Sequence, residues 1–214
     1  MQRTLIKICG ITSVPDALLA AQAGADAIGL VFYPPSPRAV DVPRAREIVA
    51  SLPPFVTVVA LFVDASEAEI RGILREVPID WLQFHGSESP AFCAAFQRPW
   101  MKALRMSEGL DVHAAARDYS AARALLLDSY RAGIPGGTGE SFDWSRVPRD
   151  LPRPLVLAGG LDSSNVGEAV SRVRPAAVDV SGGVEARKGV KDPARIQQFI
   201  AAVRAADASQ GQQQ

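Results

Sequence analysis

The chain has 214 residues, of which 48% are hydrophobic, and its 23 basic residues balance its 23 acidic residues. This length fits one domain whose core is large enough to need no disulfide or metal for stability. A neutral chain lacks the basic excess with which nucleic-acid-binding proteins neutralise phosphates.

Neither the cysteine usage nor the apolar runs point to export or to a membrane. Two cysteines and two histidines are too few for a disulfide-rich secreted domain or for a paired zinc-ligand pattern. The first residues lack the apolar stretch of a signal peptide, and no apolar run approaches the roughly 18 residues of a membrane span. We therefore expect a cytoplasmic protein that uses no metal and binds neither nucleic acid nor a membrane.

Short apolar runs alternate with longer segments of helical period along nearly the whole chain. The runs of strand length lie at residues 5–9, 27–32, 56–63, 81–84, 101–104, 124–127, 155–158 and 177–180. The helical segments lie at 15–23, 43–52, 67–77, 90–96, 112–119, 144–147, 164–173 and 193–205. Capping residues support three of the helix starts, namely Ser13 or Asp16, Ser66 with Glu69, and Asp192 before Pro193.

Eight strand-then-helix units imply parallel strands joined by crossover helices. A doubly wound open sheet is the competing architecture, but it usually has fewer strands. We predict an α/β protein with a single (β/α)8 TIM barrel over residues 1–206. The polar, glutamine-rich segment 207–214 is predicted to be a disordered tail.

Polar side chains interrupt several of the expected strands near their carboxyl ends, where barrels of this kind hold their active sites. Residues two apart in a strand share a face, and the apolar residues between them should face the helices. Alternation therefore turns five side chains toward the barrel interior: Lys7, Cys9, Gln83, His85 and Asp179. The sixth strand ends in Asp128 at the mouth. Because several ionisable groups in one interior are costly to desolvate, the set favours a substrate-binding site.

Each of these residues also has a structural interpretation. Cys9 alone is compatible with a small buried hydrophobic residue, and Asp128 with a helix cap or turn residue. His85 precedes a glycine and can be satisfied by loop backbone. Lys7 and Asp179 can form a structural ion pair in the barrel core.

Glycine-rich segments follow the last three strands. They contain Gly137 and Gly139, then Gly159 and Gly160, then Ser181, Gly182 and Gly183. Glycine lets backbone N–H groups approach an anion, and barrels often bind phosphate after strands 7 and 8 beside a short extra helix. We predict a phosphate site there, with the short helix at 184–188 and a lid after strand 6. Each glycine pair taken alone is equally compatible with an ordinary turn.

A proline-rich loop follows the second strand and ends at Arg38. Its prolines stiffen the loop, and a planar guanidinium matches a carboxylate bidentately. Arg38 is therefore a candidate for binding a carboxylate, and a surface arginine in a rigid loop is the alternative.

These segments together resemble phosphoribosylanthranilate isomerase. The resemblance spans about residues 5–200 and rests on Lys-Ile-Cys-Gly-Ile-Thr at 7–12, Ser-Pro-Arg at 36–38, Gln-Phe-His-Gly at 83–86, Leu-Asp-Ser at 127–129, Gly-Gly-Thr-Gly at 136–139, Phe-Asp-Trp at 142–144, Leu-Ala-Gly-Gly-Leu at 157–161 and Val-Asp-Val-Ser-Gly-Gly-Val-Glu at 178–185. It implies a cofactor-free isomerase of tryptophan biosynthesis. The reaction is the Amadori rearrangement of N-(5-phosphoribosyl)anthranilate to 1-(2-carboxyphenylamino)-1-deoxyribulose 5-phosphate.

The resemblance also implies roles for three residues. Cys9 is expected to be the general base, Asp128 the general acid, and Arg38 the ligand of the anthranilate carboxylate. The base must be a thiolate, and we expect Lys7 on the same face to lower the pKa of Cys9. The acid must be protonated, which desolvation of Asp128 favours.

The chain departs from the family pattern at one position after strand 8. The family has Ser-Ser-Gly there, whereas Ser181 is followed here by Gly182 and Gly183. The lost hydroxyl removes one side-chain contact, but the backbone N–H groups remain. We therefore expect phosphate binding to survive.

Other functions fit parts of the pattern. The aminoaldose isomerase of histidine synthesis shares the fold, but it is expected to carry Asp where Cys9 stands and to bind two phosphates. A pentose-phosphate epimerase would need metal-binding histidines. A non-catalytic phosphate-binding barrel would not need both Cys9 and Asp128. We expect a monomer or homodimer that acts on a small phosphorylated molecule.

Overall fold

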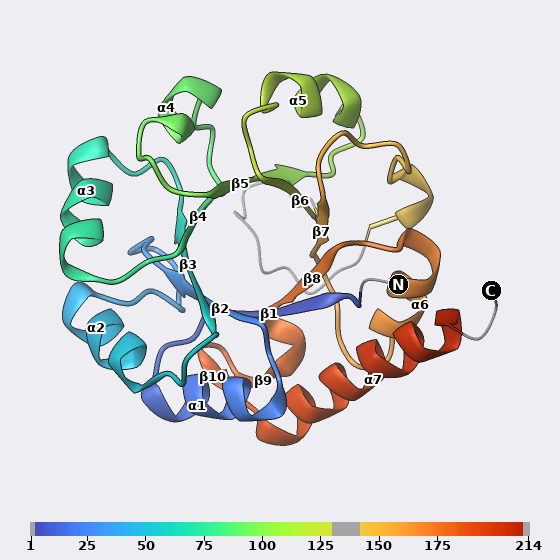
Figure 1. Ribbon diagram of the computed structural model, residues 1–214, viewed down its shortest axis with the longest axis horizontal. Helices are drawn as coiled ribbons and strands as arrows, with labels where there is room; N and C mark the ends of the chain where they lie inside the picture. The colour runs from blue at the N-terminus through green and yellow to red at the C-terminus, as the bar shows by residue number, and fades with distance from the viewer. Residues whose placement is uncertain (1–2, 130–141, 212–214) are drawn as a thin grey trace.

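In a computed structural model, which describes residues 3–129 and 142–211, eight parallel strands close into a barrel. The strands are β1 (Leu5–Cys9), β2 (Ala27–Val31), β3 (Thr57–Phe62), β4 (Trp81–Phe84), β5 (Trp100–Arg105), β6 (Ala124–Asp128), β7 (Leu155–Leu157) and β8 (Ala177–Val180). Neighbours pair in chain order and β8 pairs with β1, which confirms the predicted barrel. Figure 1 looks along the barrel and shows the helices as an outer ring.

At least one helix follows each barrel strand, as the strand–helix alternation predicts. The helices are α1 (Val14–Ala23), α2 (Val42–Ser51), α3 (Glu67–Glu76), α4 (Pro90–Ala94), α5 (Val112–Asp118), α6 (Val166–Val173) and α7 (Pro193–Gly211), with 3-10 helices η1 (Trp144–Arg146) and η2 (Gly182–Val184). Ser13 caps α1, and Ser66 with Glu69 forms the predicted capping box of α3. These caps satisfy backbone N–H groups that have no partner within the helix.

Side-chain alternation in the strands separates two cores. Ile6, Ile8 and Phe84 belong to the large core between the strands and the helices. A smaller apolar cluster fills the barrel interior and consists of Val59, Met101, Ala103, Ala124, Leu126, Val156 and Ala158. Leu61 lies two residues further along β3 than Val59 and packs with Cys9 at the mouth. The filled interior therefore forms a floor beneath any site at the carboxyl ends of the strands.

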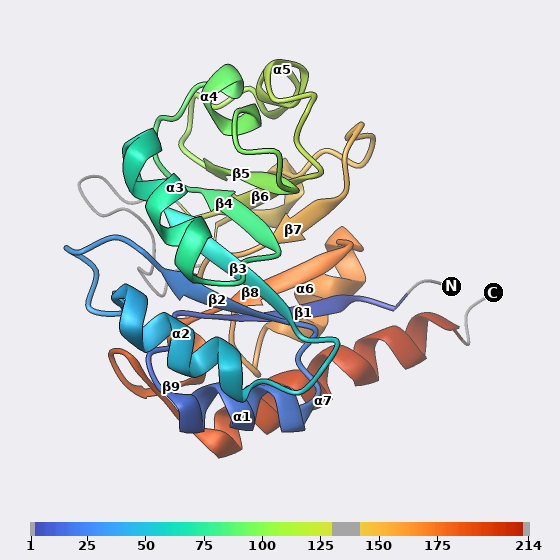
Figure 2. The same cartoon turned by 60° about the vertical axis from the view of Figure 1, so that its left-hand side comes forward.

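The last helix ties the two ends of the chain together. Asp207 accepts hydrogen bonds from the backbone N–H and the hydroxyl of buried Thr4, at 2.9 and 2.7 Å. Figure 2 shows both ends on the same side of the barrel. The helix α7 reaches Gly211, so it extends past the boundary expected at residue 206, and residues 207–211 are helical. Residues 212–214 lie outside the described part of the chain.

The segment after β8 differs from its prediction. The 3-10 helix η2 is present, but the helix expected at 184–188 is wrong, because β9 (Glu185–Arg187) and β10 (Val190–Lys191) form an antiparallel hairpin there. Glu185 already has extended backbone, with φ −100° and ψ 139°, and Gly189, with a left-handed φ of 78°, lies between the two strands. The turn brings Lys191 back to Glu185, and the two side chains form a buried ion pair at 3.0 Å.

The predicted lid after β6 lies within residues 130–141. Gly137 and Gly139, the phosphate ligands expected in that loop, are outside the described residues as well.

The contact between Thr4 and Asp207 predicts a measurable share of the stability. Replacing Asp207 with alanine leaves the buried Thr4 donors without an acceptor, which costs about 1–3 kcal/mol. We expect Asp207→Ala to lower the free energy of unfolding by that amount in urea titrations. Asp118→Ala, at an exposed position of α5, is the matched control and should change it little. Equal stability of the two variants would contradict this account of the chain ends.

Candidate active site

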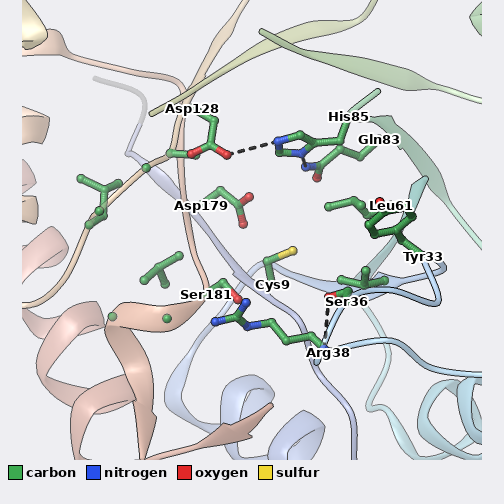
Figure 3. Close-up of a pocket in the computed structure, with 18 of the residues that line it drawn as sticks. Cys9, Tyr33, Ser36, Arg38, Leu61, Gln83, His85, Asp128, Asp179 and Ser181 are labelled. Atoms are coloured by element: carbon green, nitrogen blue, oxygen red, sulfur yellow. Dashed lines mark hydrogen bonds and ion pairs between the residues drawn. The ribbon is translucent and has the colours of Figure 1, made fainter. Parts of the chain in front are cut away.

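A cavity of about 450 Å³ opens at the carboxyl ends of the strands. Its lining includes polar or reactive side chains from β1, β4, β6 and β8, namely Cys9, Gln83, His85, Asp128 and Asp179. Arg38 and the glycine segments after β7 and β8 complete the rim. Figure 3 shows Cys9 and Asp128 on different sides of this space, with Asp179 between them. The structure therefore brings most of the predicted site residues into one pocket.

Lys7 is the exception, because it lies beneath the pocket and does not line it. Its ammonium forms a buried ion pair with Asp179 at 2.9 Å, and the two residues are register partners of β1 and β8. This is the structural interpretation left open by the sequence. A direct contact between Lys7 and a ligand is blocked as long as this pair and Cys9 cover it.

The sequence analysis missed Gly29 of β2, which makes room for both β1 side chains. A side-chain carbon at Gly29 would lie 2.7 Å from Cys9 Sγ and 2.9 Å from Lys7 Nζ. A glycine inside a strand often marks such a close approach. That signal was present in the run Ala-Ile-Gly-Leu-Val at 27–31.

The effect of Lys7 on Cys9 has the predicted sign, because Lys7 lowers the pKa of the thiol, but the pKa is raised overall. Burial raises the pKa of the Cys9 thiol, and the positive charge of Lys7 only opposes that rise. Asp179 raises it further, since its carboxylate disfavours a nearby thiolate. For Lys7, burial lowers the pKa, but the charges of Asp179 and Cys9 and the hydrogen bonds to them together outweigh burial, so its pKa is raised. The cation beside Cys9 is thus already paired with a carboxylate.

Asp128 ends β6 and lies against His85. Its Oδ2 is 3.1 Å from His85 Nε2, and its Oδ1 accepts the backbone N–H of Ser129 at 2.8 Å. Gln83 Nε2 lies 3.1 Å from His85 Nδ1. With the amide donating to Nδ1, the imidazole carries its proton on Nε2, which faces Asp128. The Gln83 amide therefore orients the His85 ring, and His85 Nε2 lies close to Asp128 although it makes no hydrogen bond to a described residue.

Arg105 and Gly159 help to place His85 and Asp128. Arg105 donates to the carbonyl of His85 at 3.0 Å. Gly159 has a φ of 86°, and a side-chain carbon there would approach Ser129 N to 2.3 Å and Asp128 Oδ1 to 2.9 Å. Gly159 was predicted to bind phosphate. The structure shows that a glycine at this position leaves the room that Asp128 and Ser129 need.

Arg38 reaches the pocket but is already paired. Its Nε and Nη2 donate to the two carboxylate oxygens of Glu185 at 2.7 and 2.8 Å. These hydrogen bonds raise the pKa of Arg38. Sequence reasoning did not find Glu185, which belongs to the last quoted segment but lies 147 positions from Arg38.

The loops after β7 and β8 have the form expected of an anion site. Gly160 has a φ of 61°, and a side-chain carbon at Gly183 would lie 2.0 Å from the carbonyl of Leu161. The hydroxyl of Ser181 is buried without a hydrogen-bond partner among the described residues. Such an orphaned hydroxyl beside glycine backbone can be satisfied by an anion. At Gly182 an added carbon would meet only Arg38 Nη2, at 3.5 Å, so a serine side chain has room there.

Two absences hold for the described residues, 3–129 and 142–211. They contain no group of three His, Cys, Asp or Glu side chains that is arranged to hold a metal ion. None of their helices is both long and apolar enough to cross a membrane.

Comparison with known proteins assigns the family. The model of the N-(5'-phosphoribosyl)anthranilate (PRA) isomerase family matches residues 6–202. The N-(5'-phosphoribosyl)anthranilate isomerase of Pseudomonas putida strain W619 is 61% identical over 206 residues, which are 96% of this chain and all of that protein. The chain belongs to the PRA isomerase family. It is an isomerase of tryptophan biosynthesis, as the sequence resemblance implied.

Solved structures of PRA isomerases share the fold closely. The crystal structure of the enzyme from Thermotoga maritima is 41% identical, has a TM-score of 0.87, and covers 94% of this chain and 99% of its own. A PRA isomerase in complex with reduced 1-(o-carboxyphenylamino)-1-deoxyribulose 5-phosphate is 40% identical with a TM-score of 0.84, and the coverage is again 94% and 99%. Membership of this family favours the Amadori rearrangement over the histidine-pathway reaction and over a purely binding role.

The electrostatics of Cys9 give a direct prediction for this PRA isomerase family member. Because Lys7 opposes the rise in the thiol pKa, Lys7→Met should raise the pKa of Cys9 further. The measurement is the pH dependence of iodoacetamide alkylation in a Cys93→Ala background, where only Cys9 reacts. The exposed Lys188→Met is the matched control and should leave the midpoint unchanged. An unchanged or lower midpoint in Lys7→Met would refute the influence of Lys7.

Proposed function

We propose that Cys9 is the general base and Asp128 the general acid of the Amadori rearrangement. The single observation that carries the proposal is their shared cavity, with Cys9 at the end of β1 and Asp128 at the end of β6. A ribose ring between them would present its ring oxygen to one group and C2 to the other. General acid–base catalysis requires this reach, because a proton moves only over hydrogen-bond distance.

The first step opens the ring. The Asp128 carboxylic acid gives its proton to the ring oxygen, the bond between C1 and that oxygen breaks, and the nitrogen lone pair forms a C=N bond. Asp128 is then a carboxylate 3.1 Å from His85 Nε2, and solvent returns the proton that it has given. The protonated state of Asp128 that the mechanism needs stays a prediction.

The second step moves the double bond. The Cys9 thiolate takes the proton from C2, the C–H electrons form C1=C2, and the C=N electrons return to nitrogen. The enol then becomes a ketone as a proton leaves the C2 hydroxyl and another reaches C1. The proton gained by Cys9 balances the one given by Asp128, so exchange with solvent restores both groups.

We propose that two parts of the rim bind the two charged groups of the substrate. These parts are the glycine loops after β7 and β8, and Arg38. Gly160, Ser181, Gly182 and Gly183 bind the phosphate through backbone N–H groups and the free Ser181 hydroxyl, aided by the start of η2. Arg38 binds the anthranilate carboxylate. Gln83, His85 and Asp179 contact the sugar, whereas Lys7 acts through Asp179 and Cys9. Gly137, Gly139 and Gly159 stay predicted as further phosphate contacts.

Three substitutions test these roles in a direct assay that follows the loss of phosphoribosylanthranilate fluorescence. Cys9→Ala and Asp128→Ala should each lower kcat by about 10²–10⁴-fold, the usual contribution of a general acid or base. Arg38→Ala should mainly raise KM. A near-normal kcat in either of the first two variants would remove that residue from its role.

We also propose that the enzyme acts in the cytoplasm, as a monomer or homodimer. A soluble biosynthetic substrate and the absence of a membrane-spanning helix in the described residues support this. Sedimentation equilibrium of the full chain distinguishes the two oligomeric states.

A further inference from the structure

A buried charge network lies behind the pocket, outside the acid–base machinery. Glu185 begins β9, and its carboxylate bridges Arg38 and Lys191. The side chain of Glu185 is 5% exposed and that of Lys191 is fully buried. Buried charges are costly unless each one is paired and hydrogen-bonded, so two cations around one carboxylate are retained against a considerable desolvation penalty.

The pairing decides which edge of the Arg38 guanidinium is available. Nε and Nη2 form the side edge, and both donate to Glu185. The end edge consists of Nη1 and the second Nη2 hydrogen, and no described residue accepts from Nη1. Arg38 lines the cavity, and Figure 3 shows its guanidinium turned toward Ser181, beside Cys9. A guanidinium edge binds a carboxylate with two parallel hydrogen bonds, so the end edge is a ready site for one.

The same network holds Arg38 in place from other sides. Gly10, with a φ of 73°, makes room for the arginine stem, since a side-chain carbon there would lie 2.5 Å from Arg38 Cδ. Lys191 Nζ donates to the carbonyl of Ser181 at 3.1 Å and so joins the carboxylate-binding side to the phosphate loop. Glu185 thus faces two cations, although burial lowers the pKa of Lys191.

The pKa values agree with a fixed, fully ionised carboxylate at the centre. Burial by itself would raise the pKa of Glu185, but the hydrogen bond from Arg38 and the charge of Lys191 lower it. Glu185 therefore stays an acceptor for both cations at neutral pH.

We propose that Glu185 is a positioning residue that sets the carboxylate specificity of the pocket. It occupies the side edge of Arg38 and thereby presents the end edge to the carboxylate of the anthranilate ring. The inference rests on the proposed role of Arg38. It adds a role in substrate selection for the β9–β10 hairpin. This role is carried by Glu185, which does not itself touch the substrate.

The test compares two ligands that differ only in the carboxylate: the reduced product analogue and its counterpart with an unsubstituted phenyl ring. In Glu185→Gln the amide NH₂ opposes an Arg38 donor, so the guanidinium loses its fixed orientation. We expect Glu185→Gln to weaken binding of the carboxylate ligand about tenfold or more, the loss typical of a charge-assisted hydrogen bond. The affinity for the phenyl ligand should not change. Calorimetric titration of the full chain gives both dissociation constants.

Two controls separate positioning from a structural effect. Glu168→Gln removes an exposed α6 carboxylate that also pairs with an arginine, and it should leave both affinities unchanged. If Glu185→Gln does not fold, Glu185→Asp keeps the charge but retracts the carboxylate, and the same selective loss is expected. Parallel weakening of both ligands, or no change in either, would overturn the proposal.

Arg38→Met separates this proposal from the one on which it rests. If Arg38→Met weakens both ligands equally, the role of Arg38 in binding the carboxylate is wrong, and the positioning role of Glu185 falls with it. If Arg38→Met acts only on the carboxylate ligand and Glu185→Gln does not, only the positioning role is wrong. If both the role of Arg38 and that of Glu185 are correct, the double variant Arg38→Met/Glu185→Gln should bind the carboxylate ligand no more weakly than Arg38→Met alone.

Discussion

The parallel pairing of β1 with β8 joins the first and last strands of the barrel and closes it. The rest of the site depends on this pairing. Lys7 and Asp179 are register partners in this pairing, and their buried ion pair links the two strands across the interior. Immediately beyond this pair, β1 presents Cys9 and β8 leads to Ser181. The proposed general base and the proposed phosphate loop therefore become neighbours although they lie far apart in the sequence. Without closure, the pocket would lose both at once.

Closure also sets the electrostatics of the thiol. Lys7 lies close enough to favour a Cys9 thiolate, but Asp179 takes up much of its effect, and burial raises the thiol pKa. A base of raised pKa is ionised less often near neutrality, but it binds a proton more strongly when it is ionised. Lys7 and Asp179 balance each other's charge in the barrel interior. Cys9 is the neighbouring group whose protonation we propose to change during the reaction.

Most of the fold and much of the site follow from local rules in the sequence. The period of two in strands assigned Gln83 and Asp179 to the interior, and a neighbouring apolar residue such as Phe84 to the helix side. What could not be predicted depends on contacts between distant segments. Arg38 was predicted to bind a substrate carboxylate, and its pairing with Glu185 was not foreseen, because nothing near Arg38 in the sequence reveals Glu185. The hairpin that carries Glu185 was predicted to be a helix, because nothing local in the sequence reveals the antiparallel pairing of β9 with β10 or the ion pair between Glu185 and Lys191.

The central claim is that Cys9 and Asp128 act on one substrate held between a phosphate loop and the Arg38 end edge. A crystal structure of this enzyme with the reduced product analogue tests it most directly. The account predicts Cys9 Sγ and an Asp128 oxygen within about 3–3.5 Å of the ligand atoms that correspond to C2 and the former ring oxygen. It also predicts the phosphate at Ser181–Gly183 and the carboxylate at Arg38. A ligand bound with either Cys9 or Asp128 out of reach of its atom would contradict the account.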